Sequence, residues 1–202
     1  GMDSNLLNKL ERQLHFLAEI DKAKQVVRNT LLLDKSRQEN DAEHSWHMAV
    51  AAFVLWEYAN FEDMDMVRVF KMILLHDIVE IDAGDVFAYS IVDPELRAKE
   101  ERKAAERIFG LLPEDQRKLF YDLWIEYDER KTNESKFANA LDRFMPIYHN
   151  YRTDGTQWKR FNVTKEQVLI KNRHVQEGSK ILWEYIEKIV EESVEQGYLK
   201  NS

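Results

Sequence analysis

The sequence predicts an all-α protein, a single compact multi-helix bundle, and three observations support this fold class. Apolar residues recur at three- and four-residue steps along nearly the whole chain, which is the period of an amphipathic helix. Three prolines and six glycines are few for 202 residues, so the turn signals that would separate many strands are scarce. No internal repeat or low-complexity tract interrupts the helical pattern.

The first three helices are predicted from apolar spacing and from one capping position. The apolar stripe of the first helix consists of Leu6, Leu10, Leu14 and Leu17. Asn40 or Asp41 can cap a second helix over residues 42–59. Its second half is apolar on almost all sides, so we expect it at the centre of the bundle. A third helix over residues 64–77 ends in an adjacent histidine and aspartate.

Proline and glycine mark the helices that follow. Gly84 permits a turn after the third helix. Asp93 and Pro94 have the residue types of a helix cap and a first helical position, and Gly110 is placed to end that helix. Pro113 then begins the next predicted helix.

The C-terminal helices are predicted from a capping box and from one internal proline. Residues 135–151 have helical spacing, and Pro146 is expected to kink or shorten that helix. Thr164 and Gln167 form a capping box for a helix that starts at residue 165. The last helix is predicted over residues 180–195.

A length of 202 residues suits one ordinary domain with a full hydrophobic core. We expect one helical domain over residues 1–202, with a core of about residues 17–150 and C-terminal helices over about residues 164–195. The longest stretch without helical spacing is residues 152–163, which is too short to predict a separate linker.

The composition excludes several classes of function. Without cysteine, the chain cannot use a thiol nucleophile, a disulfide or a cysteine zinc site, and this composition suits a reducing cytoplasm. A net charge of −8 disfavours a nucleic-acid polymer as partner. No apolar run approaches the roughly 18 residues that a membrane helix needs. We therefore expect a cytoplasmic protein without a membrane partner, whose small substrate can still be anionic if a metal reverses the local field.

Four ionisable residues stand where the apolar spacing predicts burial: His44, His76, Asp77 and Asp142. Burial of such groups is costly unless something compensates their charge. Two imidazoles and two carboxylates that converge from three helices form a set that suits one divalent metal ion, such as Mn, Co, Fe, Ni, Zn or Mg. His47, one turn beyond His44, is expected to be an ordinary packed histidine.

These motifs resemble the HD domain superfamily of metal-dependent phosphohydrolases. The stretches "AEHSWHMAV", "LLHDIVEIDAGD" and "EYDERKTNESKFANALDRF" are most similar to the branch that contains the 5'-deoxynucleotidases, and the similarity covers about residues 17–185. The resemblance implies metal ligation by His44, His76, Asp77 and Asp142. It also implies catalytic roles for Glu80 and Asp85 and phosphate binding by Arg28.

The residues themselves agree with these roles to different degrees. Glu80 follows His76 by four residues, so it faces the same side if the helix continues. There it could relay the proton of a water molecule. Asp85, on a loop after Gly84, could act as a general acid. Arg28 has the planar fork that suits a phosphate, but an ion pair with a nearby acidic residue is the alternative.

Two further features narrow the prediction. No histidine lies between Asp77 and Asp142, whereas the two-metal members of the superfamily resemble one another in placing extra histidines there; this indicates one metal ion. The nucleotidases carry an aromatic residue directly after the phosphate-binding arginine, and this chain has Asn29.

Two functions of different class remain open at this point. The first is hydrolysis of a small phosphomonoester, above all a (deoxy)nucleoside 5'-monophosphate, by a metal-activated water molecule. The second is a non-catalytic module for sensing or interaction that binds a metal or a nucleotide. A homodimer is expected from the resemblance, with Trp124, Trp158 and Trp183 as candidate contacts.

Overall fold

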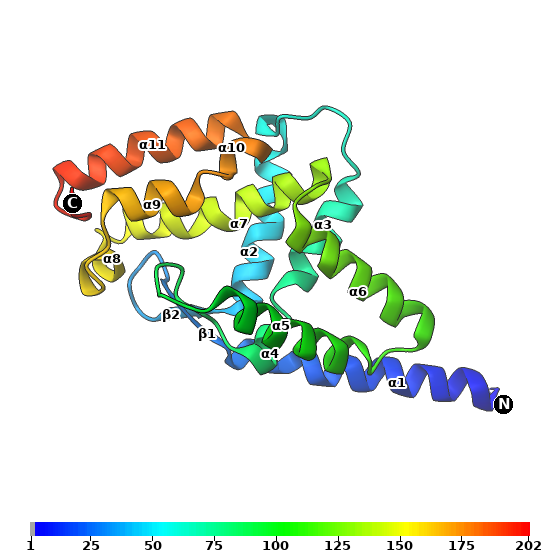
Figure 1. Ribbon diagram of the computed structural model, residues 1–202. Helices are drawn as coiled ribbons and strands as arrows, with labels where there is room; N and C mark the ends of the chain where they lie inside the picture. Colours follow the sequence, from blue (N-terminus) through cyan, green and yellow to red (C-terminus); the bar gives the residue numbers. More distant parts are fainter. Residues whose placement is uncertain (1–2) are drawn as a thin grey trace.

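The structure, a computed structural model, describes residues 3–202 and is built almost entirely from helices (Figure 1). The longer helices are α1 Ser4–Ile20, α2 Asp41–Leu55, α3 Met66–His76, α5 Pro94–Phe109, α6 Glu114–Glu129, α7 Asn133–Arg152, α9 Lys165–Asn172 and α11 Lys180–Glu195. The shorter elements are α4 Glu80–Ala83, α8 Thr156–Arg160, α10 Val175–Gly178, the 3-10 helices η1 Asp21–Gln25 and η2 Trp56–Tyr58, and the strands β1 Val27–Leu31 and β2 Gln38–Asn40. The all-α prediction is confirmed. None of the helices in the described part of the chain is both long and apolar enough to cross a membrane.

The two strands form a small antiparallel hairpin that the helical spacing did not predict. Val27 pairs with Asn40 and Leu31 pairs with Gln38, and the register is irregular between these pairs. The hairpin ends directly at α2, because Asn40 also caps that helix: its side chain accepts from the backbone N–H of Glu43 in a capping box. Asp41 is therefore the first helical residue, and its side chain is free for another role.

The third helix is shorter than predicted. α3 ends at His76, and Asp77 is its C-cap. A turn of three residues follows, and Glu80 begins the separate helix α4, so the condition under which Glu80 would share a helix face with His76 is not met. Gly84 ends α4 with φ of +77°, a left-handed conformation that favours glycine.

The caps of the later helices follow the sequence signals. Asp93 caps α5 with Pro94 at its first position, and Thr164 caps α9 in a box with Gln167. Pro146 does not shorten its helix as expected, because α7 runs through Pro146 as a helix of 20 residues. Packing on both sides holds α7 in place: α10 and α11 cover one side, and α2, α3 and α6 lie against others (Figure 1).

Two apolar features lie elsewhere than the sequence suggests. The leucine stripe of α1 is exposed, with Leu6 58% and Leu14 53% accessible, because Phe16 is the residue by which α1 enters the core. Conversely, Trp124 and Trp158 are only 6% and 1% exposed, so they are core residues, and their assignment to a dimer contact is wrong. Residues 152–163, predicted as irregular, contain α8.

Candidate metal centre

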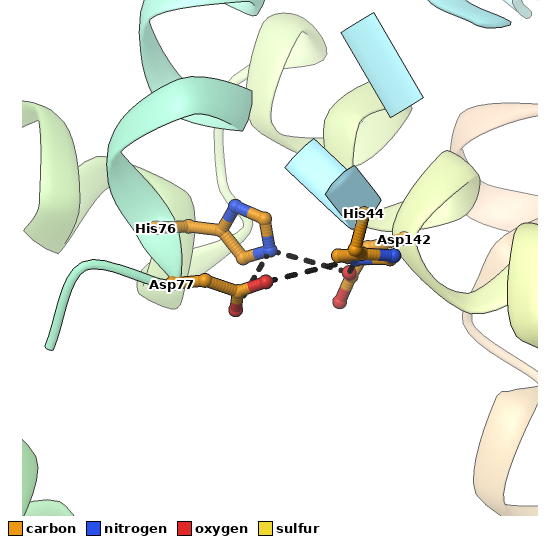
Figure 2. Close-up of side chains that lie close together, drawn as sticks. All are labelled: His44, His76, Asp77 and Asp142. Atoms are coloured by element: carbon orange, nitrogen blue, oxygen red, sulfur yellow. Dashed lines mark hydrogen bonds and ion pairs between the residues drawn. The ribbon is translucent and has the colours of Figure 1, made fainter. Parts of the chain in front are cut away.

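The four predicted ligands come together at one point (Figure 2). His44 comes from the first turn of α2, His76 and Asp77 from the end of α3, and Asp142 from the middle of α7. The Nε2 atom of His44 lies 2.9 Å from Oδ1 of Asp142, and Nε2 of His76 lies 3.2 Å from the same oxygen. Nε2 of His76 also lies 3.0 Å from Oδ1 of Asp77.

These distances fit a metal ion. Ligand atoms at about 2.1 Å from a metal lie about 3 Å apart when they occupy neighbouring coordination positions. One donor atom from each of the four residues lies within 4.8 Å of the others, so His44, His76, Asp77 and Asp142 could hold one ion. Two nitrogen and two oxygen donors are a set that several divalent transition metals accept.

Both histidines are oriented by a second contact at their other ring nitrogen. Nδ1 of His76 donates to the backbone carbonyl of Ile73 at 2.6 Å, three residues earlier on α3. Nδ1 of His44 lies 3.3 Å from a carboxylate oxygen of Glu39 in β2. Such contacts fix the ring and leave Nε2 free to ligate. In both rings, Nε2 is the nitrogen that lies next to the carboxylate of Asp142.

The cluster compensates its own charges in this structure. Burial and Arg28 act to lower the pKa of His44, but the hydrogen bonds to Asp142 and Glu39 outweigh them and raise it. Burial also opposes the shift at His76, whose pKa is raised well above its ordinary value by Asp77 and Asp142. Burial alone would raise the pKa of Asp142, yet the two histidines hold it well below its ordinary value. A metal ion would replace the protons that the imidazoles share with these carboxylates.

Arg28 lies at the centre of a ring of carboxylates beside the four ligands. Its Nε lies 3.3 Å from Glu39, and its Nη1 lies 3.4 Å from Asp41, 3.5 Å from Asp77 and 3.8 Å from Asp85. The acidic residues that precede Arg28 most closely in the sequence, Glu19 and Asp21, instead bind Lys22 and Lys24. The Arg28 side chain is 12% exposed, so its positive charge is shared among buried groups.

Among the residues of the site, Glu80 departs most clearly from the ordinary protonation of a carboxyl group. Although α3 does not continue to it, its backbone N–H donates to the carbonyl of Asp77 at 3.0 Å and holds it beside the ligands. Burial, together with the neighbouring carboxylates Asp77 and Asp41, raises the pKa of Glu80 far above its ordinary value. Asp85 follows Gly84 on a loop, and its carboxylate lies within 4.8 Å of those of Asp41 and Glu80.

Two site residues were missed from the sequence: Glu39 and Asp41. Glu39 joins Arg28 to His44, and Asp41 is 1% exposed beside Arg28. Burial and Asp77 raise the pKa of Asp41 to about 7 despite the opposing effect of Arg28. The stretch "ENDAEH" predicts a helix start, and acidic residues are common at that position because they are stabilised near a helix N-terminus. Their burial beside an arginine depends on the hairpin, which no sequence signal indicated.

Two neighbouring positions have other partners. His47 packs edge-on against His149, with ring centroids 5.4 Å apart, as a packed histidine would. Asn29, the residue in place of an aromatic, is engaged from α8: Nε2 of Gln157 donates to its carbonyl at 2.6 Å and to its side-chain oxygen at 3.2 Å. The side chain of Asn29 is thus committed to the fold.

Comparison with known proteins agrees with this geometry. The chain is 32% identical over 131 residues to the human 5'-deoxynucleotidase HDDC2, a match that covers 64% of this chain and 62% of the human protein. A match to the Dictyostelium discoideum 5'-deoxynucleotidase HDDC2 shows 28% identity over 117 residues, 56% of this chain and 62% of that protein. The chain thus spans less than two thirds of the length of these curated relatives.

A solved structure matches over nearly the whole chain. It is the crystal structure of a predicted metal-dependent phosphohydrolase from Magnetospirillum magnetotacticum MS-1, with 49% identity and a TM-score of 0.88. The match covers 95% of this chain and 98% of that one. The profile of the HD domain matches residues 20–183, which include all four candidate ligands. This chain belongs to the HD domain family.

Proposed function

We propose that this protein is a divalent-metal-dependent phosphohydrolase that acts on a small phosphomonoester, with a (deoxy)nucleoside 5'-monophosphate as the leading candidate. The observation that carries the proposal is the placement of a proton-holding carboxyl group, Glu80, directly beside a four-residue cluster that could hold a metal. The names of the relatives, 5'-deoxynucleotidases and a predicted metal-dependent phosphohydrolase, support the same reaction.

We propose that His44, His76, Asp77 and Asp142 hold one divalent ion, which is Mn, Co, Fe, Ni, Zn or Mg. When bound, such an ion supplies a Lewis acid that polarises phosphate oxygens and lowers the pKa of water. The chain's own groups do the rest. The guanidinium of Arg28 lies beside the cluster and can bind two phosphate oxygens at once.

Overall, hydrolysis transfers one proton from the attacking water molecule to the leaving ester oxygen. A bond forms from a water oxygen to phosphorus, the bond from phosphorus to the ester oxygen breaks, and the leaving oxygen takes up a proton. A cation at the four ligands would lower the pKa of Glu80 and leave it as a carboxylate, so Glu80 is assigned to accept the proton of the attacking water. Asp85, within 4.8 Å of Glu80, is assigned to the leaving oxygen from its loop.

The alternative is a non-catalytic module that senses or binds a metal or a nucleotide. A binding module needs the four ligands and Arg28 but has no use for Glu80, whose burial among carboxylates is costly. The presence of Glu80 therefore favours the enzyme.

The decisive experiment is phosphate release from a panel of nucleoside monophosphates and sugar phosphates, with each candidate metal added in turn. The metal-loaded wild type should release phosphate, and His76→Ala should lose about 1,000-fold or more because the ion is lost. Elemental analysis should find one ion per chain in the wild type. His47→Ala is the matched control, since His47 lies one turn along α2 and packs on His149. A metal-loaded wild type that cleaves nothing in the panel leaves only the binding module.

We propose further that the chain is one domain and forms a homodimer. The packing of α10 and α11 on α7 supports a single cooperative unit, which calorimetry should record as one unfolding transition. The exposed leucines of α1 support a contact between two copies. Sedimentation equilibrium should show a dimer that the double substitution Leu10→Glu and Leu14→Glu dissociates; a monomeric wild type contradicts it. A cytoplasmic location stays a prediction from the absence of cysteine.

A further inference from the structure

The short helix α4 connects the two carboxyl groups that we assign to proton transfer. Glu80 is the first residue of α4, and Gly84 ends the helix directly before Asp85. Gly84 has φ of +77° and ψ of 162°, and a Cβ atom added to it would meet no other atom within 4 Å. The backbone conformation, and not crowding, therefore favours glycine here. Because glycine has the widest choice of conformations, the direction in which the chain leaves α4 needs a further restraint.

Arg97 of α5 supplies this restraint, and α5 lies against α4 (Figure 1). Nη1 of Arg97 donates to the backbone carbonyl of Ala83 at 2.7 Å, and its Nη2 donates to the carbonyl of Gly84 at 2.7 Å. Among residues 3–202, no other group donates a hydrogen bond to either carbonyl. The last carbonyls of a helix have no partner within the helix, so the guanidinium acts as the cap of α4.

The two hydrogen bonds hold both peptide planes that flank Gly84. A peptide group is planar and includes the Cα atoms on both of its sides. The plane with the Ala83 carbonyl contains Cα of Gly84, and the plane with the Gly84 carbonyl contains Cα of Asp85. One rigid guanidinium holds both planes, so it restricts φ and ψ of Gly84 and defines the position of Cα of Asp85.

The burial of Arg97 agrees with this role. Over residues 94–103, the first part of α5, every residue is exposed except Arg97 and Glu101, which lie one turn apart. The Arg97 side chain is 18% exposed, and Oε1 of Glu101 accepts from its Nε at 2.9 Å. All three nitrogen atoms of the guanidinium therefore have an acceptor within the protein.

The loop beyond Asp85 is anchored by separate contacts. Phe87 packs on Phe161, with ring centroids 4.6 Å apart, and on Tyr89, with ring centroids 5.4 Å apart. Asn172 donates from Nδ2 to the hydroxyl of Tyr89 at 3.2 Å. These contacts do not involve α5. Loss of the guanidinium should therefore leave the loop on the protein and change the orientation of Asp85.

We infer that Arg97 is a positioning residue of the active site, whose guanidinium fixes the turn at Gly84 and thereby aims the carboxyl group of Asp85 at the leaving oxygen of the substrate. The donors of Arg97 are used by Ala83, Gly84 and Glu101, so Arg97 acts through Asp85. As the bond from phosphorus to the ester oxygen breaks, that oxygen takes the proton held by Asp85, and Arg97 keeps its own protons. This inference rests on the proposed phosphohydrolase function and adds to it a residue that controls protonation of the leaving group.

The test uses two phosphomonoesters that differ in the basicity of the leaving oxygen. A nucleoside leaves as a strongly basic alkoxide that requires a proton, whereas p-nitrophenyl phosphate releases a weakly basic phenolate that does not. For deoxyadenosine 5'-monophosphate, metal-loaded Arg97→Gln should have a kcat about 100-fold below the wild type and an unchanged KM, because a misplacement of about 1 Å has effects of this size. For p-nitrophenyl phosphate, its kcat should stay within about threefold of the wild type. Loss of the metal or of the fold would instead lower both rates.

Three further variants locate the effect. Arg107→Gln is the matched control, because Arg107 lies on the same helix and also binds α4, but through the side chain of Asp82. It should keep the wild-type ratio of the two kcat values. Arg97→Lys keeps the charge without the fork, so its kcat for the nucleotide should lie between those of the wild type and Arg97→Gln. Adding Arg97→Gln to Asp85→Asn should not slow hydrolysis of the nucleotide further, because both changes remove the same step.

Amide hydrogen exchange gives a readout that does not depend on activity. The amides of Ala83 and Gly84 donate to the carbonyls of Val79 and Glu80 at 3.0 and 2.8 Å and close the last turn of α4. In Arg97→Gln these two amides should exchange about tenfold faster, because the turn has lost its cap.

The outcomes separate failure of the inference from failure of the proposed function. An equal loss of kcat for both substrates in Arg97→Gln, or a further loss when it is added to Asp85→Asn, overturns the inference and leaves the proposed function intact. Unchanged exchange at Ala83 and Gly84 overturns the inference as well, because the turn would then be held without the guanidinium. A metal-loaded wild type that hydrolyses neither substrate overturns the proposed function, and faster exchange in Arg97→Gln would then leave Arg97 with the role of holding the turn alone.

Discussion

Asp142 and Arg143 are neighbours on α7, yet the electrostatic surroundings of their charges differ. Asp142 meets two imidazoles that lie 2.9 and 3.2 Å from one of its oxygens, so every charge near it has a partner. Arg143 has no carboxylate within 4.0 Å among residues 3–202, and its positive charge adds to burial in lowering the pKa values of Lys171 and His174. One helix thus presents a candidate metal ligand and an unpaired guanidinium at adjacent positions.

This comparison shows that a charged side chain without an ion-pair partner is as informative as one that has such a partner. Convergent donors that are buried and mutually compensated, such as His44 with Asp142, can exchange protons for a metal without disturbing the fold. A basic group without such a partner, such as Arg143, instead acts on the protonation of Lys171 and His174. The four predictions below test this difference, from the largest expected effect to the smallest.

Glu80→Gln should separate catalysis from metal binding. Loss of the proton acceptor should lower kcat by about 100- to 10,000-fold, because general acid–base groups contribute that much. Elemental analysis should still find the ion, since none of the four candidate ligands changes. Asp82→Asn, two residues along α4, serves as control because Asp82 instead binds Arg107. Full activity of Glu80→Gln would show that its raised pKa has no role in the reaction.

Arg28→Gln should destabilise the protein, because it leaves several buried carboxylates without their counter-charge. The free energy of unfolding, from denaturant titration, should fall by about 3 kcal/mol. Arg28→Lys keeps the charge and should lose about 1 kcal/mol, but it should raise KM because an ammonium cannot bind two phosphate oxygens in a fork. If Arg28→Gln were as stable as the wild type, the ring of carboxylates would be compensated in another way.

Metal binding should release protons, and the affinity should rise with pH. The pKa values of His44 and His76 are raised in the folded protein without metal, so their imidazoles carry protons that an ion must displace. The same sign holds for stability: the contribution of these groups is complete below the ordinary histidine pKa of about 6.5 and is lost as pH rises through the raised values. Calorimetry in buffers of different ionisation enthalpy should count about one to two protons released per ion. A metal affinity that does not change between about pH 6 and pH 8, around that ordinary value, contradicts this expectation.

The charge of Arg143 should be visible in the titration of His174. Its imidazole resonance should titrate near pH 4, and Arg143→Gln should raise that pKa by a fraction of a unit, about 0.5, because burial remains the larger cause. Arg173→Gln should leave it unchanged. A wild-type titration near the ordinary histidine pKa would show that the basic groups do not act on one another.

Local signals in the sequence decided much of the fold. Asp93 with Pro94 and Thr164 with Gln167 start helices where their side chains can accept from backbone N–H groups, and this depends on residues within one turn. The convergence of His44, His76, Asp77 and Asp142 was also predictable, because charged groups at apolar positions must meet a compensating partner.

Other features depend on contacts between distant segments. The proline rule predicts disruption at Pro146, yet packing from both sides keeps α7 helical through it. Glu39 and Asp41 read as ordinary residues of a helix start, and only the pairing of β1 with β2 brings them to Arg28.

The sequence by itself determined the helical fold class, the helix starts and the four groups that meet at the candidate metal centre. Each follows from a local rule or from the cost of burying a charge. The tertiary structure decided which carboxylate holds a proton, which residues surround Arg28, and which groups the charge of Arg143 acts on. Those properties depend on the distances between charges carried by different helices, and a linear pattern contains no such distances.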